Sequence, residues 1–79
     1  MFNDIETNEL LLVKKSLYFP YEYKKIMKHG SILLVLENNF GATFKNRSLV
    51  CLMENNRITF DHFFLSNYAN ESCFEMLKC

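Results

Sequence analysis

The sequence predicts an α+β fold: an N-terminal helix or helical pair, a three- to four-stranded antiparallel meander and a short C-terminal helix. Three observations predict it. Seventy-nine residues provide one hydrophobic core, so we expect a single compact domain over 1–79. Apolar residues near the N-terminus recur at three- and four-residue steps. The middle of the chain alternates short apolar runs with Asn-rich turns.

The first two elements are expected to be helices. A helix over 5–17 carries acidic residues in its first turns and Lys14 and Lys15 near its end, as the helix dipole favours. A second helix over 20–28 would begin at Pro20 and end at Gly30. The alternative for this segment is a β-hairpin that pairs 23–28 with 31–36.

The later elements are read from shorter patterns. Strands are predicted over 31–37, 42–45, 49–53 and 58–60, with a hairpin turn over 54–57. Polar residues at 70–72 resemble a helix cap, so the last element is a helix over 71–78.

Composition restricts the class of protein. Nine Lys plus Arg balance nine Asp plus Glu, which argues against a strongly basic protein that coats nucleic acid. The first residues include three acids and resemble no secretory signal, and no apolar run approaches the roughly 18 residues that span a bilayer. We therefore expect a cytoplasmic protein that makes no membrane contact and whose three cysteines are reduced.

No motif for catalysis or metal binding is present. Cys73 and Cys79 are six residues apart, a poor spacing for zinc even with His29 or His62 nearby. Glycine-rich phosphate loops and nucleophile elbows are absent from the sequence. We expect no catalytic residue, no metal and no cofactor, so the protein is not predicted to be an enzyme.

Aromatic residues point to an interface. They make up 15% of the chain, and four of them fall within 60–68. A small core cannot enclose them all, and exposed aromatic clusters are typical of protein interfaces. The predicted partner-binding residues are Phe63, Phe64, Tyr68, Tyr21 and Tyr23.

The leading functional hypothesis is a small non-catalytic protein-binding module. Asn occurs nine times and Ala and Gly twice each, a usage that fits a genome rich in A and T, such as a phage or virus. We therefore expect an inhibitor or adaptor that acts on a host or cognate protein such as a nucleic-acid enzyme. A homodimer is also considered.

The alternative hypothesis is a nucleic-acid-binding module that uses 14–29. This stretch has five lysines against one acid, Glu22, and four aromatic residues between them. Lysines follow phosphates and rings stack on bases, as in proteins that bind single strands. The candidate residues are Lys14, Lys15, Lys24, Lys25 and Lys28.

Overall fold

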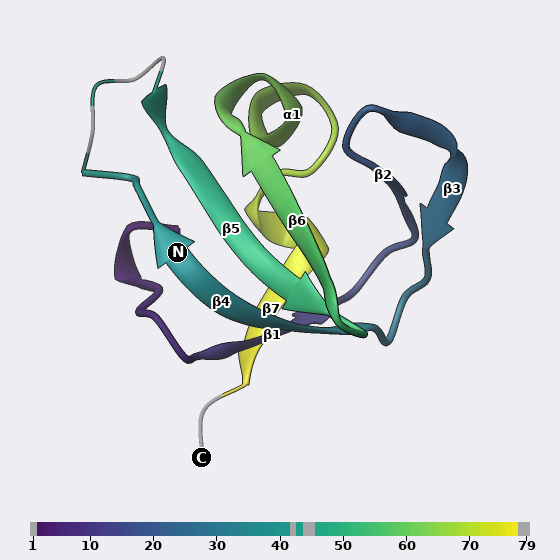
Figure 1. Ribbon diagram of the computed structural model, residues 1–79, viewed down its shortest axis with the longest axis horizontal. Coiled ribbons are helices and arrows are strands. Elements are labelled where there is room, and N and C mark those ends of the chain that lie inside the picture. Colours follow the sequence, from purple (N-terminus) through teal and green to yellow (C-terminus); the bar gives the residue numbers. More distant parts are fainter. Residues whose placement is uncertain (1, 42, 44–45, 78–79) are drawn as a thin grey trace.

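The computed structural model describes residues 2–41, 43 and 46–77, and its secondary structure consists mainly of antiparallel β-strands (Figure 1). The elements in chain order are η1 (Phe2–Asp4), β1 (Leu10–Val13), β2 (Leu17–Phe19), β3 (Glu22–Met27), β4 (Ile32–Asn38), β5 (Ser48–Met53), β6 (Asn56–Asp61), α1 (His62–Asn67), η3 (Glu71–Cys73) and β7 (Phe74–Leu77). The helices η1 and η3 are single 3₁₀ turns, and α1 has six residues. None of the helices in the described part could span a bilayer.

The strands form a five-stranded sheet and a separate hairpin. The sheet order is β6-β5-β4-β1-β7, and β2 pairs with β3 alone. Strand β1 lies between β4 and β7, with Leu10 opposite Leu34 on one side and Leu77 on the other. The last strand, β7, therefore pairs with the first strand, β1.

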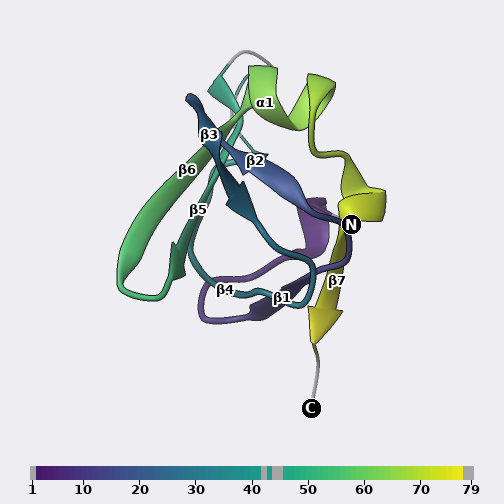
Figure 2. The ribbon, with the colours of Figure 1, turned by 90° about the vertical axis from the view of Figure 1, so that its right-hand side faces the viewer.

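One hydrophobic core joins the sheet, the hairpin and α1. Inward residues of the sheet such as Leu11, Leu33 and Phe60 are completely buried, and they cluster with Met27 of β3 and Phe64 of α1. In Figure 2 the strands β1 and β4 lie at the bottom and α1 at the top, with the hairpin β2–β3 between them. The hairpin and α1 thus cover the core on the side away from β1 and β4.

The predicted α+β class is wrong, because residues 5–17 form no helix. Asn8 has a φ of 69°, which a helix does not accept, and β1 and β2 follow it. The four consecutive apolar residues of β1 explain the error. Leu11 and Val13 enter the core while Leu10 and Leu12 face outward, so period-two alternation decides the structure over the apparent helical spacing.

The second predicted helix is also wrong. Residues 22–27 form β3, and the predicted hairpin between 23–28 and 31–36 is absent, because β3 pairs with β2 whereas β4 pairs with β1 and β5. Tyr21 has a φ of 62° and reverses the chain just after Pro20. The turn that Pro20 signals therefore lies between two strands and not at a helix start.

The C-terminal helix is the third error. Asn70 does cap a helical turn, since its side chain accepts a hydrogen bond from Ser72 N at 3.0 Å, but that turn ends after three residues. Phe74–Leu77 is β7, whose backbone pairs with β1. A local cap signal fixes where a helix starts and not how long it runs.

Three predicted strands are present as β4, β5 and β6. β4 has the predicted length but is shifted by one residue, β5 is longer by one residue and β6 is longer by three. Glu54 and Asn55 both have positive φ in a two-residue turn between β5 and β6. The strand predicted over 42–45 lies largely outside the described residues.

Candidate functional site

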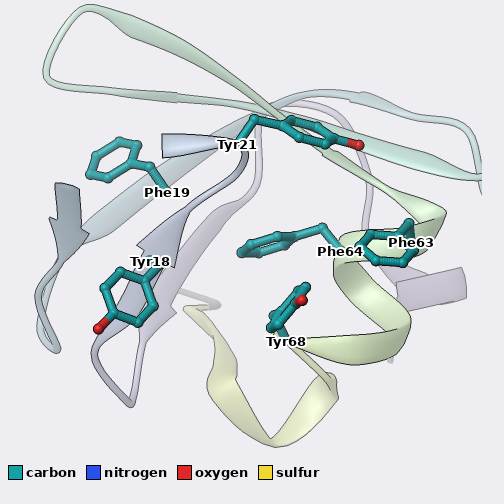
Figure 3. A pocket seen from close by; sticks show the side chains of 6 residues that line it. All are labelled: Tyr18, Phe19, Tyr21, Phe63, Phe64 and Tyr68. Atoms are coloured by element: carbon teal, nitrogen blue, oxygen red, sulfur yellow. The ribbon is translucent and has the colours of Figure 1, made fainter. Parts of the chain in front are cut away.

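Two segments far apart in the sequence meet in one aromatic surface, shown in Figure 3. The hairpin β2–β3 contributes residues from β2 and its turn, and the segment of α1 contributes the rest. We call this group the aromatic surface: Tyr18, Phe19, Tyr21, Phe63, Phe64 and Tyr68.

The aromatic surface has a buried floor and an exposed rim. Phe19 and Phe64 are 7% and 6% exposed and belong to the core. The other four rings are more than half exposed: Tyr18, Tyr21, Phe63 and Tyr68. Tyr68 contacts both phenylalanines of α1, with ring centroids 5.9 Å from Phe63 and 5.6 Å from Phe64. The rim is therefore a group of large apolar rings held open to solvent.

Asp61 holds the two halves of the aromatic surface together. Its side chain caps α1, because Oδ1 accepts a hydrogen bond from Phe64 N at 2.9 Å. The hydroxyl of Tyr21 donates to Oδ2 of the same carboxylate. One side chain therefore fixes the start of α1 and the position of the β2–β3 turn.

The space between the rings is small. The pocket holds about 30 Å³ of free volume, far below the roughly 300–1,000 Å³ of pockets that enclose small-molecule ligands. Its lining is aromatic in all six residues. The shape accepts one apolar side chain of a larger molecule better than it accepts a cofactor.

The structure spreads the five candidate lysines along the hairpin. Lys24 and Lys25 are neighbours on β3 and so point to opposite sides. Lys25 Nζ lies 4.7 Å from the ring centroid of Phe19 and 4.0 Å from Glu22 Oε2. Lys25 is therefore engaged at the edge of the aromatic surface with a carboxylate beside it.

The other three lysines lie at the far end of the hairpin. Lys14 and Lys15 precede β2, and Lys28 follows β3. Gly30 N donates to Val13 O at 2.7 Å, which brings these two segments side by side. All five lysines are exposed. They do not share one face, because Lys24 and Lys25 point to opposite sides of β3.

Most of the predicted partner-binding residues meet in the structure. Phe63, Tyr68 and Tyr21 lie on the rim and Phe64 forms part of the floor, whereas the side chain of Tyr23 lies outside the described part. Sequence reasoning missed Tyr18, Phe19 and Asp61 as members of the site. Asp61, which directly precedes the first residue of α1, is a cap signal that would have placed this helix.

Titratable and thiol groups form no second centre in the described residues. No group of three or more His, Cys, Asp or Glu side chains there could hold a metal ion, and Cys79 lies outside them. Burial raises the pKa of the Cys51 thiol to about 12, so this thiol stays protonated at neutral pH. An unreactive thiol behaves as a core residue.

Comparison of the chain with protein-family models, with curated proteins and with solved structures gave no match.

Proposed function

We propose that this chain is a small non-catalytic protein-binding module and that a partner protein docks on the aromatic surface. The observation that carries the proposal is the rim of four rings, each more than half exposed, around an apolar pocket. Contiguous exposed apolar patches mark interaction sites, and tyrosine and phenylalanine are enriched in protein interfaces.

The geometry favours an extended partner segment. The pocket is small and lined by rings, and aromatic-lined sites of this kind accept proline or aliphatic side chains from extended chains. A polyproline helix suits this role because little chain entropy is lost when it binds. That the partner belongs to a host cell, with this chain as its inhibitor or adaptor, stays a prediction from residue usage.

Nucleic acid is the second candidate, because the exposed rings of Tyr18 and Tyr21 lie on the hairpin that carries the lysines. Two observations favour protein over nucleic acid. Lys24 and Lys25 point to opposite sides of β3, and the carboxylates of Glu22 and Asp61 lie beside the aromatic rings. These two carboxylates would repel the phosphates of a nucleic acid bound at the rings.

The test selects peptides from a displayed random library against the folded protein and then titrates the selected peptides. We expect Tyr68→Ala and Phe63→Ala each to weaken binding by about 30-fold, which corresponds to about 2 kcal/mol for a central aromatic anchor. The control is Ile32→Ala, since Ile32 is 43% exposed and lies outside the aromatic surface. It should change the affinity less than twofold.

The same variants are titrated against single-stranded DNA and RNA at several salt concentrations, together with the double variant Lys24→Glu/Lys25→Glu. Protein binding predicts that the lysine variant changes mainly the association rate. Submicromolar oligonucleotide binding at physiological salt, lost in the lysine variant and unchanged in Tyr68→Ala, would contradict the proposal and favour the second candidate.

A further inference from the structure

Strand β6 forms an open edge of the five-stranded sheet. It pairs with β5 on one side, and no strand of the described residues pairs with its other side. Its six residues pair with β5 in unbroken register and include no proline, lysine or bulge, three features that commonly protect an edge strand. The second open edge, β7, has four residues. β6 is therefore the longer open edge.

Alternate residues of β6 direct their backbone groups away from β5. The carbonyl of Ser48 on β5 accepts a hydrogen bond from Asn39 N at 2.9 Å, so Ser48 turns its backbone toward β4. This direction alternates along an antiparallel strand, and the next residue of β5 therefore bonds to its partner on β6, Phe60. Arg57 and Thr59 alternate with the residues that bond to β5. Their N–H and C=O groups thus point to the open side of β6.

Arg57 and Thr59 line a groove between β6 and the hairpin β2–β3. The hairpin stands beside this edge of β6 (Figures 1 and 2). We call the space between them the edge groove; it is lined by residues 19–22 and by Arg57, Ile58, Thr59 and Asp61. Its volume is about 210 Å³, compared with about 30 Å³ for the pocket of the aromatic surface. A second hollow lies between residues 25–28 and the end of β5, near the start of β6.

The hairpin restricts what can pair with β6. The edge of a second sheet, such as that of another copy of this chain, carries further strands behind it, and the hairpin stands where these would lie. A single extended segment needs the width of one strand, about 4.8 Å. Such a segment also supplies backbone acceptors and donors for the outward groups of Arg57 and Thr59. The edge groove therefore suits one extended peptide segment.

We infer that the partner protein binds with an extended segment that adds to β6 as a sixth strand in the edge groove. The inference rests on the proposed function, because Phe19 and Tyr21 line both the edge groove and the aromatic surface. The part of the segment beside β6 donates backbone N–H groups, which excludes proline at every second position. The residues that follow it reach the aromatic surface, where proline is accepted.

Charges along the groove favour one arrangement of the partner's side chains. Glu22 and Asp61 line the edge groove near α1, where the cation Arg57 is already paired with Glu37 at 2.5 Å. Two lysines and one glutamate line the hollow near the start of β6. We expect the bound segment to place a basic residue beside Asp61 and an acidic residue at the opposite end, since opposite charges across an interface fix the register.

The first test measures amide hydrogen exchange by NMR in the wild-type protein, free and saturated with a linear peptide selected from the random library. We expect the amides of Arg57 and Thr59 to exchange at least about tenfold more slowly in the complex, because the added strand accepts hydrogen bonds from them. The amides of Ile58 and Phe60 bond to β5 and are protected in the free protein as well. Unchanged exchange at Arg57 and Thr59 in the saturated complex overturns the inference.

Methylation of the peptide's backbone nitrogens, one position at a time, tests the same bonds with the protein unaltered. Strand addition uses the N–H of every second peptide residue. We expect an affinity loss of at least about tenfold at alternate positions and of less than about threefold at the positions between them. A peptide that tolerates methylation at every position overturns the inference, because a polyproline helix uses no backbone N–H.

The third test changes β6 itself. Thr59→Pro removes an outward N–H and leaves the hydrogen bonds to β5 in place, a position at which an edge strand tolerates proline. Thr59→Ala is the matched control, because it shortens the same side chain and keeps the N–H. Circular dichroism confirms that both variants fold. We expect Thr59→Pro to weaken peptide binding at least about tenfold and Thr59→Ala less than about twofold, and equal affinities for these two variants overturn the inference.

The outcomes separate strand addition from docking on the aromatic surface. A peptide that Tyr68→Ala weakens, but that protects neither Arg57 nor Thr59, supports the aromatic surface and overturns strand addition. A peptide that protects both amides and is unaffected by Tyr68→Ala and Phe63→Ala supports strand addition and contradicts the aromatic surface. A library that yields no binding peptide overturns both. Protection of the two amides that rises with the concentration of free protein also overturns the inference, because a second copy then occupies the edge.

Discussion

The hydroxyl of Tyr21 donates a hydrogen bond to Asp61 Oδ2 across 40 residues of sequence, while Oδ1 of the same carboxylate caps α1. This bond connects the turn of the hairpin to the start of the only α-helix among the described residues. The exposed rings on either side owe their relative position to it.

Removing the Asp61–Tyr21 connection should lower the free energy of unfolding, and two variants separate the contributions of the two side chains. We expect Asp61→Ala to cost about 1–2 kcal/mol, because it removes a helix cap and the acceptor for Tyr21. Tyr21→Phe should cost about 0.5–1 kcal/mol, since the bond lies in an exposed region. Urea unfolding measures both. The control is Tyr18→Phe, which removes a hydroxyl that points away from the other rings (Figure 3). Equal losses for Tyr21→Phe and Tyr18→Phe would show that the bond contributes nothing.

The two neighbours Leu33 and Leu34 on β4 should differ in their contribution to stability. Leu33 is 0% exposed, so Leu33→Ala should cost about 2–5 kcal/mol through lost burial and a cavity. Leu34 is half-buried on the opposite side of β4, and Leu34→Ala should cost less than about half as much. Urea unfolding at low micromolar concentration gives the comparison. A larger loss of stability for Leu34→Ala than for Leu33→Ala would mean that the Leu34 side of β4 faces the core.

Substitutions in the turn between β5 and β6 that suit its positive φ angles should stabilise the fold. Glu54 and Asn55 have φ of 49° and 67°, a conformation in which Asn followed by Gly is preferred. Glu54→Asn/Asn55→Gly should therefore raise the free energy of unfolding by about 0.5–1 kcal/mol. Thermal unfolding at one pH and salt concentration measures the change. Loss of stability would indicate that the Glu54 side chain has a role that its backbone does not show.

Alkaline pH should destabilise the fold through Cys51. Its pKa rises from an ordinary 9.0 to about 12 in the folded state, because the thiol is buried. Between these pH values the unfolded chain releases the proton and the folded chain keeps it, so the free energy of unfolding falls as pH rises above about 9. At about pH 10.5 the loss is roughly 1–2 kcal/mol.

The measurement is urea unfolding at pH 8 and at about pH 10.5. Cys51→Ala has lower stability at both pH values because of its cavity, so the quantity compared is the change with pH. We expect a smaller change in Cys51→Ala than in the wild type. Equal changes would assign the alkaline sensitivity to other groups.

Some of the fold was predictable because its signals are local. The apolar run before Asn38 and the Asn-rich turn at 54–57 predict β4, β5 and β6, which are the strands joined in sequence order. Adjacent strands need only a short turn to pair, so neighbouring residues carry the information. The sequence also pointed to Phe63, Phe64 and Tyr68, whose clustering is visible without a fold.

Long-range pairing decided the rest. Leu10–Val13 reads as a helix or as a strand, and β4 and β7 settle the choice by satisfying its backbone on both sides. Tyr18 and Phe19 join the aromatic surface only because the β2–β3 turn reaches Asp61. Cross-strand pairing likewise places Leu77, Leu10, Leu34 and Leu52 in one row over β7, β1, β4 and β5. Composition and spacing determined that this chain has more large apolar residues than its core can enclose. Only the tertiary structure decided which of them stay at the surface, because a one-residue change of strand register exchanges the buried and exposed sets.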